Sequence, residues 1–357
     1  MRRPPHPRLR LHALRPLRLG PLRMTPGGAQ LPLLPDQSSW TIRDERARGT
    51  SFIAITPRSV LNSPASTRMD FWSVNPYIGC EFGCSYCYAR DTHRYAVERE
   101  SRREGESGGS GSPAIATLAP LPPSLAFERR ILVKEGAALR LARSLDPAKL
   151  GTDTVMIGTA TDPYQPAERR FRITRSLLEA LAAHKGLSVG IITKSPLVVR
   201  DIDLLKTLTE RGRATVHISL ATFDAHLARR LEARSPIPAA RIRALRQLVE
   251  AGIEARLLVA PIIPGVTDGR ESLRRLLTAA RRAGARYVGG GALRLGPAAR
   301  ATFLPLLDRE FPHLSRRYRA QYHRSIQAPA AYREALRARL AELRAELGFE
   351  PSSGMDD

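Results

Sequence analysis

Short apolar runs alternate with amphipathic segments through most of the chain after residue 150. The runs are rich in β-branched and aliphatic residues, which predicts buried strands. The longer segments carry apolar residues at three- and four-residue spacing, as at Leu177, Leu178 and Leu181, which predicts helices. The expected strands are 154–158, 187–193, 214–220, 255–262 and 286–290, and the expected helices are 168–184, 199–211, 238–251 and 269–283.

This alternation predicts an α/β fold with a parallel sheet built from right-handed βαβ units. A further aromatic-rich strand over 71–78 brings the number of βα units to six. The expected architecture is therefore a partial (βα)6 TIM-type barrel over residues 70–295, and a doubly wound sheet is the alternative. In either arrangement, chemistry belongs at the carboxyl ends of the strands. Residues 298–350 are expected to form a C-terminal helical extension.

The pattern is less regular before residue 70. We expect residues 1–50 to form a basic, Pro- and Arg-rich arm, with no clear period over 24–70 apart from a short strand at 51–55. Prolines in the first 23 residues would break an amphipathic transit helix, and Met24 is an alternative start. A helix is expected over 90–100. The Gly/Ser-rich run within 101–123 is expected to be a flexible surface insertion.

Composition and charge narrow the functional class only slightly. The formal net charge is +23, which favours a polyanionic partner such as nucleic acid. However, only five of the 57 basic residues are Lys, an Arg bias that also reflects genomic base composition. No apolar run is long enough for a membrane span. The three cysteines cannot all pair, which favours a reducing, cytoplasmic location.

All three cysteines lie in one stretch, Cys80-x3-Cys84-x2-Cys87, with Tyr86 before and Tyr88 after the last of them. Three unrelated buried thiols are improbable at this spacing. A closed zinc site with His93 as the fourth ligand is one interpretation. The other is a metal cluster with three thiolate ligands and one corner left without a protein ligand.

The second interpretation is supported by a resemblance. Cys-x3-Cys-x2-Cys with an aromatic residue before the last cysteine resembles the signature of the radical S-adenosylmethionine (SAM) enzymes. The resemblance implies that Cys80, Cys84 and Cys87 hold a [4Fe-4S] cluster, with SAM on the fourth iron. It also implies a one-electron donor of the flavodoxin or ferredoxin type and a 5′-deoxyadenosyl radical.

Several strand ends carry polar residues that the same resemblance assigns to SAM. The segment 159–168 holds Thr161, Asp162 and Glu168, which would meet the SAM amino group, although an ordinary βα turn also explains these residue types. Lys194, followed by Ser195, would meet the SAM carboxylate, or point into solvent. Strand alternation places Ser219 on one face with His217 and Ala221. The resemblance implies that Ser219 bonds SAM and that the backbone of 259–268 packs against adenine.

Taken together, the motifs over residues 70–300 resemble the spore photoproduct lyase-related branch, often labelled DNA repair photolyase-like. True photoproduct lyases carry a cysteine shortly before Thr161-Asp162-Pro163, whereas this chain has Thr159 and Ala160 there and no fourth cysteine. Repair of a thymine dimer by that route is therefore not expected. Tyr88 matches a tyrosine that serves hydrogen transfer in those lyases and is the candidate catalytic residue, although it could instead pack over the cluster.

The sequence therefore predicts a radical SAM enzyme, with nucleic acid as the favoured substrate and a peptide or small metabolite as the alternative. The absence of a spare cysteine excludes a second cluster with cysteine ligands. A hypothesis of another class is a zinc-dependent nucleic-acid-binding protein without catalysis.

Overall fold

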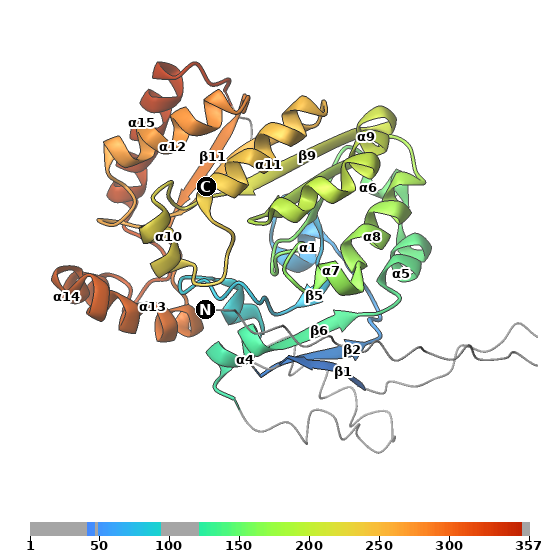
Figure 1. Ribbon diagram of the computed structural model, residues 1–357, viewed down its shortest axis with the longest axis horizontal. Coiled ribbons are helices and arrows are strands. Elements are labelled where there is room, and N and C mark those ends of the chain that lie inside the picture. The colour runs from blue at the N-terminus through green and yellow to red at the C-terminus, as the bar shows by residue number, and fades with distance from the viewer. Residues whose placement is uncertain (1–40, 47–48, 94–120, 352–357) are drawn as a thin grey trace, which may run out of the picture. The chain divides into compact units, whose positions relative to one another are not determined.

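The computed structural model describes residues 41–46, 49–93 and 121–351. These residues form two β-sheets surrounded by helices (Figure 1). The larger sheet has seven strands in the order β11-β10-β9-β8-β7-β4-β3. Its strands are β3 (Leu61–Asn62), β4 (Trp72–Val74), β7 (Thr154–Ile157), β8 (Ser188–Thr193), β9 (Arg213–Ser219), β10 (Glu254–Ile262) and β11 (Val288–Ala292).

Six of these strands are parallel and follow one another across the sheet in chain order. Each neighbouring pair from β4 to β11 is parallel, and only the short β3 runs antiparallel, at the edge beside β4. A doubly wound sheet reverses its strand order at a switch point, and this sheet does not. The architecture is therefore the expected partial (βα)6 TIM-type barrel.

The crossover helices also lie close to their expected positions, with two breaks. The expected helix over 168–184 is divided at Arg172, whose left-handed backbone (φ 52°) ends one helix before the next begins. The expected helix over 199–211 begins as a 3-10 turn. The expected elements are α7 (Glu168–Phe171), α8 (Ile173–Ala182), η1 (Pro196–Asp201), α9 (Ile202–Arg211), α11 (Pro238–Glu250) and α12 (Arg270–Arg282), whereas α10 (Ala225–Leu231) lies where the sequence predicts no helix.

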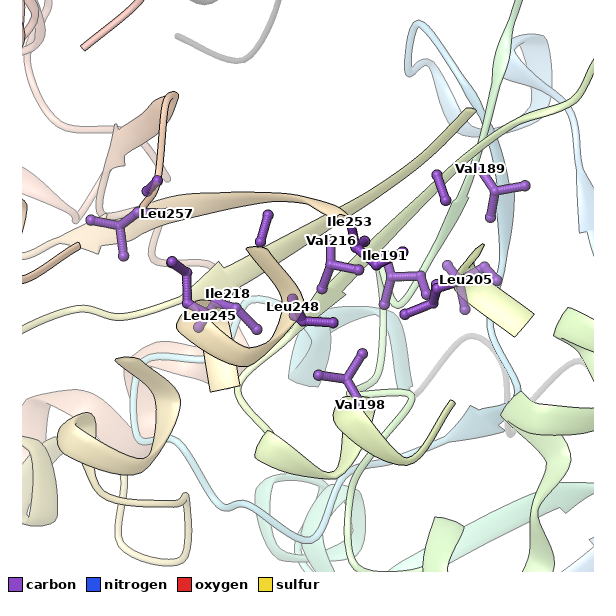
Figure 2. Packing of buried hydrophobic residues seen from close by; sticks show 14 of the residues in the cluster. Val189, Ile191, Val198, Leu205, Val216, Ile218, Leu245, Leu248, Ile253 and Leu257 are labelled. Carbon is purple, nitrogen blue, oxygen red and sulfur yellow. The ribbon is translucent and has the colours of Figure 1, made fainter. Parts of the chain in front are cut away.

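Alternation along the strands sorts side chains between the helices and the barrel interior. Figure 2 shows side chains of β8, β9 and β10 packed against those of α9 and α11. The intervening residues, Ile192, Ser219 and Leu258, face the opposite side and line a cavity. The strand residues in this packing include Val189, Ile191, Val216, Ile218 and Leu257, and the helix residues include Leu205, Leu245 and Leu248.

The second sheet departs from the sequence expectation. It has the order β1-β2-β6-β5, with β1 (Thr41–Arg46), β2 (Thr50–Ile55), β5 (Tyr77–Ile78) and β6 (Arg130–Lys134). β1 and the first residue of β2 lie within the arm expected over 1–50, so that arm is shorter than predicted. The expected strand over 51–55 corresponds to β2, and the expected strand over 71–78 is divided between β4 of the larger sheet and β5 of this one. β2 is buried at five consecutive positions, a pattern that has no period-two signal.

Further helices complete the described chain. Three of them form the expected C-terminal extension, and α15 packs against β11 and α12 at the open edge of the barrel (Figure 1). The remaining helices are α1 (Pro64–Thr67), α4 (Pro123–Arg129), α5 (Ala137–Ser144), α6 (Pro147–Leu150), α13 (Pro297–Glu310), α14 (Pro312–Gln321) and α15 (Ala330–Glu346).

Three sequence predictions lie wholly or mainly outside the described residues: the arm up to residue 40, the helix over 90–100 beyond residue 93, and the Gly/Ser insertion up to residue 120. Of the helices in the described ranges, none has both the length and the apolar character that crossing a membrane demands.

Candidate active site

The cysteine loop begins where the two sheets meet. β4 belongs to the barrel, β5 pairs with β6 of the second sheet, and Cys80 follows two residues later. The Cys80 amide donates to the Phe127 carbonyl at 2.9 Å, which ties the start of the loop to α4. Gly79 has a φ of 90°, and a Cβ there would lie 2.8 Å from that same carbonyl oxygen. Glycine is therefore required for this close approach.

The far side of the loop is held by a segment about 150 residues later in the chain. The Ser85 amide donates to the Leu231 carbonyl at 3.0 Å, and the Arg234 amide donates to the Phe82 carbonyl at 3.2 Å. Cys84 and Glu232 form an antiparallel bridge between these two contacts. Residues 231–235 therefore act as a short partner strand for the loop, which we call the clamp segment.

The end of β7 is bonded directly to the start of the cysteine loop. The Thr161 hydroxyl donates to the Gly79 carbonyl at 2.5 Å, and the Gln165 amide donates to the same oxygen at 3.1 Å. Asn75 accepts from the Ala160 amide at 2.8 Å and donates to the Thr159 hydroxyl. These bonds fix the distance between the first two strand ends of the barrel.

Asp162 joins the second and third strand ends. Its carboxylate accepts from the Thr193 hydroxyl and the Lys194 amide, each at 2.7 Å. The Lys194 side chain extends over the Tyr86 ring, with its ammonium 5.9 Å from the ring centre. Burial lowers the pKa of Lys194, but negative charge on Cys84, when that thiol is ionised, and on Glu232 outweighs that effect and raises the pKa above its ordinary value. Lys194 is therefore a permanent cation at the edge of the cysteine loop.

The inner face of β9 contributes one cavity residue and one structural residue. Ser219 lines the cavity and donates to the Ala260 carbonyl at 3.2 Å. His217 is buried on the same face but is not among the lining residues. Burial, with Arg256 and Arg213 nearby, lowers the pKa of His217 to about 3. His217 is thus a neutral structural histidine at physiological pH.

These strand ends surround a cavity of about 320 Å³, lined by all three cysteines. The opposite wall consists of Leu258, Ala260 and Pro261 of β10 and residues 291–294 at the end of β11 and beyond it. Among the described residues that line the cavity, only Tyr88 and Arg294 are classed as exposed, Tyr88 at 48%. These two side chains therefore mark its mouth. The Tyr88 hydroxyl donates to the Thr159 carbonyl across it.

Most of the residues selected from the sequence come together in this cavity. The three cysteines, Tyr88, Thr161, Asp162, Lys194 and Ser219 all line it. Ser195 does not, because its hydroxyl caps η1 by accepting from the Leu197 amide at 3.2 Å.

Glu168 also differs from the sequence expectation, since it lies outside the cavity lining. Its carboxylate is fully buried and accepts bonds from the Tyr77 hydroxyl at 2.5 Å, the Thr174 amide at 2.9 Å and Arg200 at 2.8 Å. These partners all belong to the protein, so Glu168 joins β5, α8 and η1 rather than facing SAM.

Sequence reasoning missed three features of the site. These are the clamp segment, the buried partners of Tyr86, and Arg294 at the mouth. Arg294 follows the last barrel strand by two residues, so the strand-end rule could have identified it. Nothing in the local sequence around 231–241 indicates contact with a loop 150 residues earlier.

The geometry agrees with comparisons to known proteins. The family model of the Radical SAM superfamily matches residues 74–277, which include the cysteine loop and the barrel strands from β7 to β10. This chain belongs to the radical SAM superfamily. The resemblance inferred from the cysteine spacing is thereby confirmed at the level of the superfamily.

Two relatives of this chain are described only as uncharacterised proteins. An uncharacterised protein of Mycobacterium tuberculosis (strain ATCC 25618 / H37Rv) is 33% identical over 305 residues, covering 85% of this chain and 83% of the relative. An uncharacterised protein of Methanocaldococcus jannaschii is 30% identical over 195 residues, covering 55% of this chain and 61% of the relative.

Solved structures of spore photoproduct lyase share the fold. The structure complexed with dinucleoside spore photoproduct has a TM-score of 0.57 and 13% identity, covering 84% of this chain and 80% of that one. A doubly substituted mutant of the lyase, with bound AdoMet and the same photoproduct, has a TM-score of 0.58 at the same identity and coverage. This likeness supports the partial-barrel architecture.

Radical SAM enzymes use a [4Fe-4S] cluster and SAM, which are the cofactors of this chain. The residues of the cavity fit these groups. Each thiol lines the cavity, and a cubane cluster takes each thiolate on a different iron. Burial raises the pKa of Cys84 to about 12, so the thiol protons must be displaced when iron binds.

The ligands of the alternative zinc site do not come together in the described residues. Across the described ranges, no three or more His, Cys, Asp and Glu side chains converge on a position for one metal ion. His93, the suggested fourth ligand, packs edge-on against Phe127 with ring centres 5.6 Å apart. Burial lowers the pKa of His93 to about 4, as expected for a histidine enclosed by the fold.

Proposed function

We propose that this protein cleaves SAM reductively to a 5′-deoxyadenosyl radical and uses it to modify a nucleic acid. The proposal depends mainly on one observation: a single cavity is lined by the three thiols and by the polar ends of three barrel strands. The mouth of this cavity is formed by the aromatic ring of Tyr88 and the cation of Arg294. When bound, the reduced cluster supplies the electron that breaks a carbon–sulfur bond of SAM. The chain's own residues bind, orient and shield the reacting groups.

The residues that line the cavity divide between the two cofactors. Cys80, Cys84 and Cys87 would hold three irons and leave the fourth for SAM. Lys194, a permanent cation, would meet the SAM carboxylate. Thr161, Asp162 and Ser219 would contact the polar groups of SAM at the second and fourth strand ends. Ser195 would support these contacts from outside the cavity, whereas Glu168, whose carboxylate is bonded to Tyr77 and Arg200, would not take part in SAM binding.

The mouth favours nucleic acid as the substrate. Single strands bind proteins through aromatic rings that stack on bases and through cations that contact phosphates. Tyr88 presents an exposed ring beside Arg294, and no carboxylate pairs with Arg294 among the described residues.

Two further observations support this substrate class. The net charge of +23 is of the sign that nucleic acids attract. The spore photoproduct lyases that share the fold were solved with a dinucleoside photoproduct. A one-electron donor of the flavodoxin or ferredoxin type would supply the reducing equivalent. A peptide or small metabolite remains the alternative substrate and is an outcome of the test below.

The test is anaerobic incubation of the cluster-loaded protein with SAM and dithionite, with release of 5′-deoxyadenosine as the measurement. We expect release by the protein alone and a further increase when single-stranded DNA or RNA is added. An increase with a peptide pool but not with either nucleic acid would support the alternative substrate. No release above the background of dithionite and SAM would contradict the proposed enzyme activity.

Arg294→Gln should weaken nucleic-acid binding, because one phosphate contact is lost. For single strands, the slope of log affinity against log salt concentration should fall by about 0.7 to 1. Fluorescence anisotropy with a labelled oligonucleotide between low and physiological salt measures this slope. Arg282→Gln is the matched control, since Arg282 is an exposed arginine at the end of α12 outside the cavity lining. Equal slopes for the two variants would contradict a role for Arg294.

A further inference from the structure

A buried ion pair lies directly behind the cysteine loop. Glu232 and Arg241 are 3% and 2% exposed, and an Arg241 amino group donates to one oxygen of the Glu232 carboxylate. Arg241 is also held by the carbonyls of Pro236 at 2.8 Å and Ser219 at 3.0 Å. Because Ser219 lines the cavity, this pair connects the clamp segment to the end of β9.

The second carboxylate oxygen of Glu232 faces the cysteine loop. It accepts a hydrogen bond from the hydroxyl of Tyr86, the aromatic residue between Cys84 and Cys87. Tyr86 is 4% exposed and its ring lines the cavity. Glu232 is also the residue whose backbone pairs with Cys84. One glutamate thus holds the loop by its main chain and orients the Tyr86 ring by its side chain.

The negative charge of Glu232 also contributes to the electrostatic environment of the thiols. Lys194 lies over the Tyr86 ring, and it interacts with both Glu232 and Cys84. Two cations, Lys194 and Arg241, therefore share the single negative charge of Glu232. Neutralising Glu232 would leave both cations without that partner beside Cys84.

We propose that Glu232 is a positioning residue for the cluster and for SAM: it fixes the Tyr86 ring at the cavity wall and holds one negative charge behind Cys84. The proposal rests on the proposed cluster at the three cysteines. Removing a negative charge near a cluster favours its reduced form, which carries one more electron. Releasing the Tyr86 hydroxyl removes the bond that orients the ring.

The chain provides a matched control for this proposal. Glu168 is also a fully buried glutamate whose carboxylate accepts a tyrosine hydroxyl, that of Tyr77, and an arginine amino group, that of Arg200. It differs in lying outside the cavity lining. Glu168→Gln therefore makes the same change from a buried carboxylate to an amide, and it should cost stability in the same way by disturbing a buried ion pair. It does so away from the cysteine loop.

The experiment compares Glu232→Gln with Glu168→Gln in the cluster-loaded full chain. Iron content, thermal stability and the cluster reduction potential, titrated by electron paramagnetic resonance, are measured for each. We expect both variants to lose stability, and only Glu232→Gln to shift the potential to a more positive value. Equal potentials in Glu232→Gln and Glu168→Gln would overturn the proposal and leave Glu232 with a structural role.

Tyr86→Phe tests the second half of the proposal and remains available if Glu232→Gln does not fold. It keeps the ring and the Glu232 charge but removes the hydroxyl. We expect SAM to bind several-fold more weakly than to wild type, whereas Tyr77→Phe at the control pair leaves SAM affinity unchanged. Wild-type SAM affinity in Tyr86→Phe would overturn the positioning of the ring. Wild-type protein that takes up no iron would instead contradict the proposed function.

Discussion

Cys84→Ala protein, reconstituted with iron and sulfide under anaerobic conditions, is expected to release less than about one hundredth of the 5′-deoxyadenosine released by wild type. The estimate is conservative, because loss of an outer-shell partner of a metal ligand already costs about 10- to 100-fold. Cys84 is the central cysteine of the loop, and the chain has no fourth cysteine to replace it. Iron content and absorbance near 400 nm should fall together with activity.

The control for this variant is Ser85→Ala, which changes the neighbouring residue of the same loop. The Ser85 hydroxyl donates to the Leu231 carbonyl at 3.0 Å, so its loss disturbs the clamp contact without removing a thiol. Ser85→Ala should keep most of its iron. Wild-type iron content in Cys84→Ala would refute the assignment of Cys84 as a ligand, whatever the activity.

Lys194→Ala is expected to bind SAM about 10- to 100-fold more weakly while retaining its cluster. A hydrogen bond to a charged group is worth about 1.5–3 kcal/mol, which corresponds to this loss of affinity. The ammonium lies beside Tyr86 at the cavity wall but is not among the expected iron ligands. Equilibrium dialysis with labelled SAM, run beside an iron assay on the same sample, measures both quantities.

Lys206→Ala provides the comparison, because Lys206 is an exposed lysine on α9 outside the cavity lining. It should bind SAM as wild type does. Loss of iron from Lys194→Ala would point instead to a structural role, in which the cation mainly balances the charge of Glu232 and the cysteine loop.

Much of the barrel could be predicted from the sequence, because its strands are short, apolar and separated by amphipathic helices. All six expected barrel strands are represented, although the one expected over 71–78 ends at Val74, and the expected crossover helices lie within a few residues of their bounds. The second sheet could not be predicted. The strand over 51–55 was expected, but its burial without alternation does not show which strands pair with it, and β5 has only two residues, which is too short for any period to show.

The candidate site, like the fold, could be predicted from the sequence only in part. The grouping of Cys80, Cys84 and Cys87 could be predicted because their spacing is local, and the position of Lys194 and Ser219 in the same cavity because barrel chemistry lies at strand ends. Glu168 was misplaced for a physical reason. A carboxylate at the first turn of a helix satisfies both the helix-dipole rule and a SAM contact, and only packing showed that Tyr77 and Arg200 occupy its oxygens.

The sequence alone determined the position of the cysteine loop and the order of the barrel strands, because both depend on residues close together in the chain. Only the tertiary structure decided what surrounds that loop. The clamp segment, the pairing of Glu232 with Tyr86 and Arg241, and the mouth formed by Tyr88 and Arg294 join residues 9 to more than 200 positions apart. Such contacts are set by how the strands and helices pack, and no local pattern records them.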